Sequence, residues 1–219
     1  CVAGTLLQRM DYSGKFFPDM QPLNVFVVAL IAMLVCAAFG TVTGFFIAYL
    51  NVPPFIATLA MMEIVYGIGL IVTNATPLGG YVEQYTNVSN GKFLGINYLI
   101  WIAIIVAAIT WFIFNMTRHG KYMYAIGGNP QAAEVAGVPV KATMILIYMK
   151  AAAMYGLAGF MLGAKAGGAS VNLGYGYEME AIAACTIGGV SVTGGRGKVS
   201  SAIIGVAVFE LLKAALQYL

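Results

Sequence analysis

Charged side chains are scarce in this chain. Of its 219 residues, 9% are Asp, Glu, Lys or Arg, and 61% are hydrophobic even though the 27 glycines are counted outside that fraction. A typical soluble domain has about 25% charged residues, so too little charge is present here to cover a globular surface of this size. The composition therefore excludes a soluble enzyme and a disordered tail.

Groups that bind metals or nucleic acids are scarce as well. The single histidine, His119, has no partner cluster, and Cys1, Cys36 and Cys185 lie far apart without metal-ligand or CxxC spacing. We therefore expect no metal site and no disulfide frame. A net charge of +3 is too small and too scattered for nucleic-acid binding. The chain also lacks a GxxxxGK[ST] phosphate loop, and we interpret the GGRGK run at 194–198 as a turn.

Long apolar runs are the most prominent feature of the sequence. A helix needs about 20 mostly apolar residues to cross the hydrocarbon core of a membrane. Such runs predict five transmembrane helices, over residues 24–50, 55–72, 96–116, 142–164 and 199–219. A sixth apolar stretch, 177–192, is too short to span the membrane comfortably. The fold class that we predict is an all-α polytopic transmembrane helix bundle, with about five full spans and one short or broken helix.

Basic residues in the connecting segments predict the orientation of these helices. Segment 117–141 carries three basic residues against one acid, and segment 193–198 carries two basic residues and no acid. In segments 1–23 and 73–95, acids balance the basic residues. We therefore expect 117–141 and 193–198 to face the cytoplasm and 1–23, 73–95 and 165–176 to face outside. This topology requires that the short helix also crosses the membrane.

Segment 117–141 contains a short helix with its own start and stop signals. Asn129 is a good N-cap, Pro130 suits the first helical position, and Gly137 supplies a left-handed stop. A helix of about two turns is unstable alone in water, so it must dock on another surface. The pattern leaves two interpretations open. The helix is either a connector that docks on its own protein or a lever that fits a cytoplasmic partner.

Ionisable residues inside apolar spans are expensive and count as functional candidates. Glu63 lies near the middle of the second predicted span, and Lys150 lies in the fourth. They could pair with each other, pair with other helices, or face a water-filled path. Glu210 and Lys213 stand three residues apart in the last span, so we expect them to form an ion pair on one helix face.

Small residues spaced four apart predict close packing between helices. Gly40 and Gly44 form one such pair, and Gly159 and Gly163 form another. Without a side chain, glycine lets the backbone of a second helix approach closely, which is a common device in membrane proteins. We therefore expect these positions to face other helices.

Four blocks make the sequence recognisable. In chain order they are LLQRMDYSGKFFPDM, YLNVPPFIATLAMMEIVYGIGLIVTNATPL, GKYMYAIGGNPQAAEVAGVPV and YGYEMEAIAACTIGGVSVTGGRGKV. They resemble permease subunits of bacterial ABC sugar importers, in the ribose/galactoside branch, and the first block is specifically similar to methylgalactoside-type permeases. The resemblance covers nearly the whole chain. It implies that residues 1–219 are a single transmembrane permease domain, truncated at both ends, from a permease of roughly ten helices.

The resemblance also implies a function and partners. This chain would be a transport subunit of the bacterial inner membrane and not an enzyme, and it would move a monosaccharide such as galactose, a galactoside or a ribose-like sugar. Two permease copies in the lipid would form the path, with a cytoplasmic ABC ATPase below and a periplasmic sugar-binding protein above. This chain would hold no cofactor, because the ATPase binds the ATP. The alternative from the residues is an ion-coupled secondary transporter of a small polar solute, which Glu63, Lys150 and broken helices would suit.

The resemblance places an ATPase-coupling set, and the residues themselves suggest a candidate pathway set. The ATPase-coupling set surrounds the short capped helix and comprises Gly128, Asn129, Pro130, Gln131, Ala132, Ala133, Glu134 and Gly137. The candidate pathway set lies around the Gly-rich loop before 177–192 and in the second span, and comprises Asn172, Tyr175, Tyr177, Glu178 and Glu63. Irregular backbone at membrane depth is tolerated where it is buried in protein or lines a cavity. Glu178 and Glu180 also suit the positive end of a helix dipole.

Overall fold

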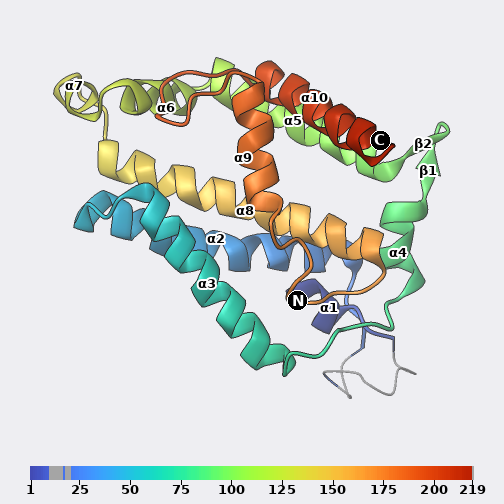
Figure 1. Cartoon of the computed structure of the whole chain (residues 1–219). Helices are drawn as coiled ribbons and strands as arrows, with labels where there is room; N and C mark the ends of the chain where they lie inside the picture. Colours follow the sequence, from blue (N-terminus) through green and yellow to red (C-terminus); the bar gives the residue numbers. More distant parts are fainter. Residues whose placement is uncertain (10–16, 18–20, 219) are drawn as a thin grey trace. The chain divides into compact units, whose positions relative to one another are not determined.

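The computed structural model describes residues 1–9, 17 and 21–218. Most of the block LLQRMDYSGKFFPDM lies outside the described residues. The elements in chain order (Figure 1) are α1 (Val2–Leu6), α2 (Val25–Leu50), α3 (Pro54–Thr73), α4 (Glu83–Asn90), β1 (Lys92–Phe93), β2 (Ile96–Asn97), α5 (Tyr98–Met116), α6 (Arg118–Gly128), α7 (Pro130–Val135), α8 (Val140–Ala166), α9 (Tyr177–Ile187) and α10 (Val199–Gln217). Apart from the two-residue strands β1 and β2, which pair antiparallel, the described regular structure is helical.

Five helices confirm the predicted spans. α2, α3, α5, α8 and α10 are each long and apolar enough to cross a membrane. Of the most apolar 18-residue window of each helix, at most 17% is buried. Apolar faces of this extent are stable only against lipid or other helices. The short helix is confirmed as α9, which ends at Ile187.

Cap residues explain where the first two spans begin and end. The Asn24 side chain accepts a hydrogen bond from the backbone N–H of Phe26 at 3.0 Å, which starts α2. Asn51, at φ 53°, ends α2 in the left-handed conformation. Pro54 then occupies the first position of α3, where its missing N–H group costs nothing. The sharp connection between α2 and α3 therefore follows directly from the local sequence.

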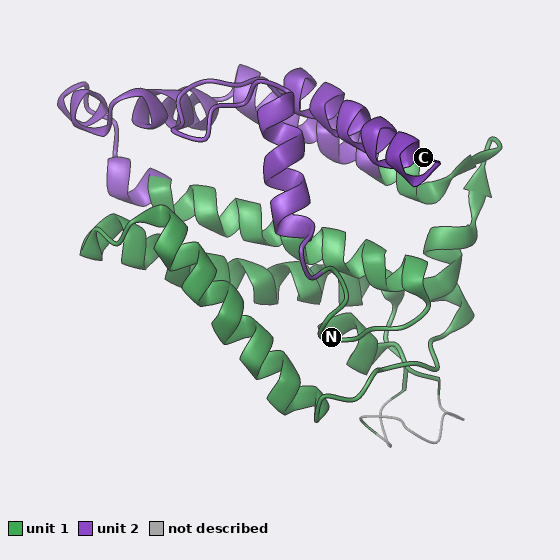
Figure 2. Cartoon of the chain, in the orientation of Figure 1, with its two compact units in different colours: residues 1–102, 144–174 green, residues 103–143, 175–219 purple. Residues whose placement is uncertain are grey.

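The chain divides into two compact units (Figure 2). Unit 1 comprises Cys1–Ile102 and Met144–Gly174, and unit 2 comprises Ala103–Thr143 and Tyr175–Leu219. Each unit has its own internal packing. The prediction of one permease domain over 1–219 stays a prediction.

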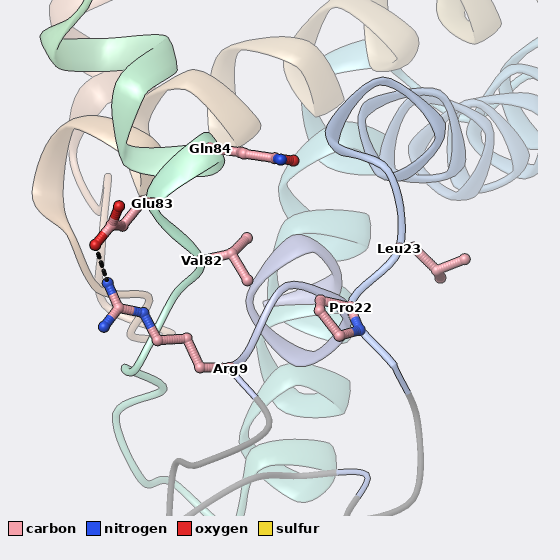
Figure 3. A pocket seen from close by; sticks show the side chains of 6 residues that line it. All are labelled: Arg9, Pro22, Leu23, Val82, Glu83 and Gln84. Carbon is pink, nitrogen blue, oxygen red and sulfur yellow. Dashed lines mark hydrogen bonds and ion pairs between the residues drawn. The ribbon is translucent and has the colours of Figure 1, made fainter.

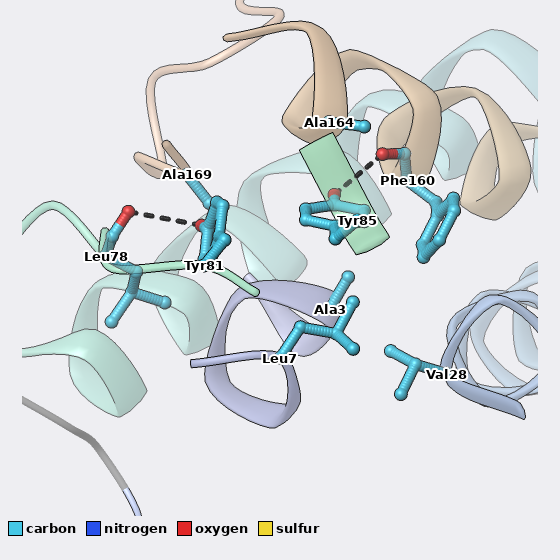
Figure 4. Close-up of a cluster of buried hydrophobic side chains, with 9 residues drawn as sticks. All are labelled: Ala3, Leu7, Val28, Leu78, Tyr81, Tyr85, Phe160, Ala164 and Ala169. Carbon is cyan, nitrogen blue, oxygen red and sulfur yellow. Dashed lines mark hydrogen bonds between the residues drawn. The ribbon is translucent and has the colours of Figure 1, made fainter. Parts of the chain in front are cut away.

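A small core holds unit 1 together outside the long apolar faces. The Tyr85 hydroxyl donates to the carbonyl oxygen of Phe160 at 2.7 Å, and the Tyr81 hydroxyl donates to that of Leu78 at 3.1 Å (Figure 4). Burial raises the pKa of the Tyr85 phenol, so the hydroxyl keeps its proton and remains a donor. The buried members of this core are Ala3, Leu7, Val28, Leu78, Tyr81, Tyr85, Phe160, Ala164 and Ala169.

Glycines bring α2 and α8 together within unit 1. A Cβ atom on Gly40 would lie 2.5 Å from the carbonyl oxygen of Tyr148, and one on Gly44 would lie 2.8 Å from Cα of Ile145. The predicted close packing of this glycine pair is therefore confirmed. In the second pair, a Cβ atom on Gly163 would lie 2.6 Å from the Tyr85 hydroxyl, whereas one on Gly159 would have nothing within 4 Å among the described residues.

Two further features differ from the sequence-based expectation. α6 fills Arg118–Gly128, which we treated as part of a loop, and its N-cap is the Thr117 side chain, which accepts from the N–H of Gly120 at 3.2 Å. The expected pairing of Glu210 with Lys213 is wrong. Lys213 Nζ instead lies 2.7 Å from Oε1 of Glu180, because α9 packs beside α10 and brings its own carboxylate to the lysine.

The α2–α8 contact makes a direct prediction. Gly40→Ala forces its new methyl group against the backbone of α8, so we expect the free energy of unfolding to fall by about 1–3 kcal/mol. The matched control is Gly159→Ala, which adds the same methyl group where nothing described lies within 4 Å. Thermal unfolding of the purified permease measures both variants. Equal midpoints for the two variants would contradict the packing role of Gly40.

Candidate coupling and pathway sites

The coupling segment folds as its start and stop signals predict. Asn129 Oδ1 accepts from the N–H of Ala132 at 3.0 Å, and Pro130 is the first residue of α7. At the other end, Gly137 has φ 82°, and the N–H of Val138 donates to the carbonyl oxygen of Ala133 at 3.0 Å. This left-handed glycine and its backward hydrogen bond close the helix. The predicted N-cap, first position and stop are therefore confirmed as structural features.

α7 presents most of its residues to the surroundings. Of the eight predicted coupling residues, Ala133 is buried and Gly128, Asn129, Pro130, Gln131, Ala132, Glu134 and Gly137 are exposed. Sequence reasoning missed Val135, whose side chain is 89% exposed at the end of the helix. Its signal was an apolar residue placed just before the stop, outside every predicted span. An exposed carboxylate beside an exposed apolar side chain makes α7 a small, mixed contact surface.

α6 leads into α7 without a linker. Asn129 ends α6, with its N–H donating to the carbonyl oxygen of Ala125 at 3.0 Å, and the same residue caps the start of α7. Tyr124 of α6 donates its hydroxyl to the carbonyl oxygen of Gly197 at 2.8 Å. A polar hollow of about 400 Å³ beside this junction is lined by Gly127, Gly128, Ser191, Thr193, Gly194, Gly195 and Arg196. The predicted coupling segment therefore lies against the turn between α9 and α10.

Two of the candidate pathway residues lie in unit 1. Asn172 is held on α3, because its Oδ1 accepts a hydrogen bond of 2.9 Å from the Tyr66 hydroxyl. Glu63 is exposed and lies three residues before Tyr66 on the same helix, which places both on one face. Among the described residues, no ion pair joins Glu63 to Lys150. Sequence reasoning missed Tyr66, although a tyrosine three residues from a carboxylate inside an apolar span was the available signal.

The other three candidates lie in unit 2. Tyr175 and Tyr177 are 70% and 54% exposed, at the entrance to α9. Glu178 and Glu180 stand in the first turn of α9, as expected for acids at the positive end of a helix dipole. The five residues therefore divide between the two units, and their common role in a pathway stays a prediction.

A second hollow, of about 480 Å³, lies in unit 1 (Figure 3). The Nε atom of Arg9 donates to the carbonyl oxygen of Tyr81 at 2.8 Å, and its Nη2 atom lies 3.5 Å from Oε1 of Glu83. Both charged side chains are exposed, so this ion pair adds little stability. The lining residues are Arg9, Pro22, Leu23, Val82, Glu83 and Gln84, and none of them belongs to the predicted site.

Comparison with known proteins identifies the family. The family described as "Branched-chain amino acid transport system / permease component" matches residues 2–219. The galactose/methyl galactoside import permease of Escherichia coli is 41% identical over 225 residues, which is all of this chain and 67% of that protein. The corresponding permease of Treponema pallidum is 37% identical, over 93% of this chain and 40% of its own length. The ribose import permease of Escherichia coli is 35% identical, over 90% of this chain and 63% of its own length. No solved structure matches significantly.

These matches agree with the helices described above. The family covers nearly the whole chain, and the five apolar helices are the spans of a protein that crosses the membrane several times. A permease component is a transport subunit rather than an enzyme, and it works with an ATPase and a substrate-binding protein. The chain therefore belongs to the permease family of ABC importers and is a multi-pass protein of the bacterial inner membrane.

Proposed function

We propose that this chain is the permease subunit through which an ABC importer moves galactose or a galactoside into the bacterial cell. The observation that carries the proposal is a capped, surface-exposed helix between apolar spans. It occurs in a chain that is 41% identical along its whole length to a galactose/methyl galactoside import permease. The lower identity of 35% to a ribose import permease makes ribose the second choice of substrate.

α7 is the contact for the ATPase in this proposal. The segment that holds it carries an excess of basic residues, which supports a cytoplasmic location. The exposed side chains of Glu134 and Val135 would meet a groove of the ATPase, which binds and hydrolyses the ATP. A second copy of this permease and the surrounding lipid would cover the exposed apolar faces of the spans.

Tyr66 and Asn172 provide the polar contact that a sugar needs on its way through the membrane. A phenol hydroxyl and a carboxamide both donate and accept hydrogen bonds, as sugar hydroxyls do. The loop that carries Asn172 is anchored, because Leu78 and Ala169 exchange two backbone hydrogen bonds of 2.7 and 2.8 Å just before it. Asn172 is exposed and Tyr66 is half-buried, so the pair would offer a weak, passing contact and leave tight binding to the partner protein.

The energy source and the substrate are tested together in cells that carry the complete importer. Uptake of labelled galactose should continue under a protonophore as long as ATP remains, and should stop when ATP is depleted. Ribose and leucine are the competing labelled substrates, since a ribose import permease and the branched-chain amino acid description both match this chain. Uptake that collapses with the proton gradient at constant ATP would identify an ion-coupled transporter instead.

Gly137, which ends α7, allows a test of the coupling role with two matched variants. Gly137 has φ 82°, a conformation that costs other L-residues about 1–2 kcal/mol and β-branched ones more. We expect Gly137→Val to lower sugar uptake per ATP hydrolysed about tenfold in proteoliposomes, because the helix end loses its shape. Gly137→Asn should keep most of the coupling, since asparagine tolerates this conformation. Normal coupling in the valine variant, with the ATPase bound, would refute the role of α7.

The Tyr66–Asn172 contact predicts a change in the maximal rate of uptake, since tight binding, and with it KM, belongs to the partner protein. Tyr66→Phe removes one hydrogen-bonding hydroxyl, worth about 0.5–1.5 kcal/mol, so we expect the maximal rate of galactose uptake to fall about 2- to 10-fold. The control is Tyr155→Phe, which removes a hydroxyl from an exposed tyrosine of α8. Initial uptake rates at saturating galactose measure both variants. An unchanged maximal rate in Tyr66→Phe would exclude the hydroxyl from the pathway.

A further inference from the structure

The turn between α9 and α10 touches the end of α6 backbone to backbone. A Cβ atom on Gly127 would collide with the backbone nitrogen of Gly195, and a Cβ atom on Gly195 would lie 2.8 Å from the carbonyl carbon and oxygen of Gly127. The end of α6 and the turn therefore meet with no side chain between them. Such a contact has almost no slack, because small displacements already bring backbone atoms into collision.

We propose that this contact transmits the movement of the coupling helix to α9 and α10, so that α6, α7 and the α9–α10 hairpin move as one body. The inference rests on the function proposed above. Within it, Gly127, Gly195 and Tyr124 are positioning residues, which act through the helices they hold and touch neither ATPase nor sugar.

Backbone hydrogen bonds within the turn hold its shape. The N–H of Ser191 donates to the carbonyl oxygen of Arg196 at 3.0 Å, and the N–H of Gly194 donates to that of Ser191 at 3.2 Å. Gly197, next in the turn, accepts the hydrogen bond from Tyr124 of α6 at 2.8 Å. A hydrogen bond and a glycine contact thus hold the same turn to the same helix. The turn follows α6 when α6 moves.

The hairpin beyond the turn is locked in two places. Close to the turn, a Cβ atom on Gly205 would lie 2.7 Å from the backbone nitrogen of Gly188, so α9 and α10 also meet through their backbones. Farther along, Glu180 and Lys213 are joined by the 2.7 Å ion pair. A backbone contact and an ion pair at separate points prevent the two helices from sliding past each other. A displacement of the turn therefore carries the whole hairpin.

The connection along the chain from α7 to α6 is also short. Because Asn129 both ends α6 and caps α7, no flexible linker separates the coupling helix from the contact at Gly127. All of these residues belong to unit 2, as do Tyr177 and Glu178 in the first turn of α9. Movement at α7 thus reaches two candidate pathway residues through packed, hydrogen-bonded neighbours within one compact unit.

Gly127→Ala tests the contact directly in the complete importer, reconstituted in proteoliposomes. We expect the variant to keep its ATPase partner and its ATP hydrolysis, while sugar uptake per ATP falls at least tenfold. Gly159→Ala is the matched control, since it adds the same methyl group to a helix where nothing described lies within 4 Å, and its uptake should be unchanged. Tyr124→Phe should lower uptake per ATP by about 2- to 10-fold through loss of one hydrogen bond. If Gly127→Ala transports like Gly159→Ala, or releases its ATPase, the inference is overturned.

A distance measurement keeps the proposal testable if the glycine variant fails to fold. Spin labels on Lys121→Cys and Lys198→Cys, in a cysteine-free permease with its partners, report on α6 and the turn. Their separation should stay the same between the nucleotide-free and ATP-vanadate states. A second pair, Lys121→Cys with Asn51→Cys, has one label in each unit and should change its separation. A changed first distance overturns the inference, whereas two constant distances overturn the coupling role of α7 on which it rests.

Discussion

Close approach of glycine backbones is the constraint on which both units depend. Lipid is as apolar as the side chains of the spans, so burial of apolar area gives helices little reason to associate, and tight packing must supply the attraction. In unit 1, Gly40 and Gly44 let α2 lie against α8. In unit 2, Gly188 and Gly205 join α9 to α10, and Gly127 joins α6 to the turn at Gly195. At each of these contacts an added methyl group would collide with the neighbouring backbone, so the contact leaves little room for one element to shift against the other.

Two polar side-chain contacts each link separate parts of the chain. Tyr66 joins α3 to the loop at Asn172, and Lys213 joins α10 to Glu180 of α9. A polar group in an apolar environment gains most from a partner nearby, because water is not there to replace it. These pairs therefore specify which surfaces meet, while the glycines determine how closely they meet. The polar contact assigned to sugar lies in unit 1 and the coupling segment lies in unit 2.

The sequence predicted whatever depends on neighbours along the chain. The five spans, the caps at Asn129 and Gly137, and the close packing of Gly40 and Gly44 all follow from local composition or spacing, and the structure bears them out. α6 was missed because three glycines and two basic residues made Arg118–Gly128 resemble a connecting loop between spans. Lys213 was given the wrong partner because spacing along α10 indicates only neighbours on that helix, and Glu180 lies on α9. The contact at Gly127 had no sequence signal, since it joins residues 68 positions apart whose only shared property is the absence of a side chain.

The division between coupling and substrate contact fits the breadth of the family. One family takes in a branched-chain amino acid description, galactose/methyl galactoside permeases and ribose permeases. What α7 needs is an N-cap, a left-handed stop and an exposed face, and none of these depends on the cargo. Cargo chemistry matters only where side chains face the path, and the pair that we propose there, Tyr66 and Asn172, offers a hydroxyl and a carboxamide group to a sugar. Because the proposed coupling helix and the proposed sugar contact belong to different units, substitutions at the second leave the residues that shape the first unchanged.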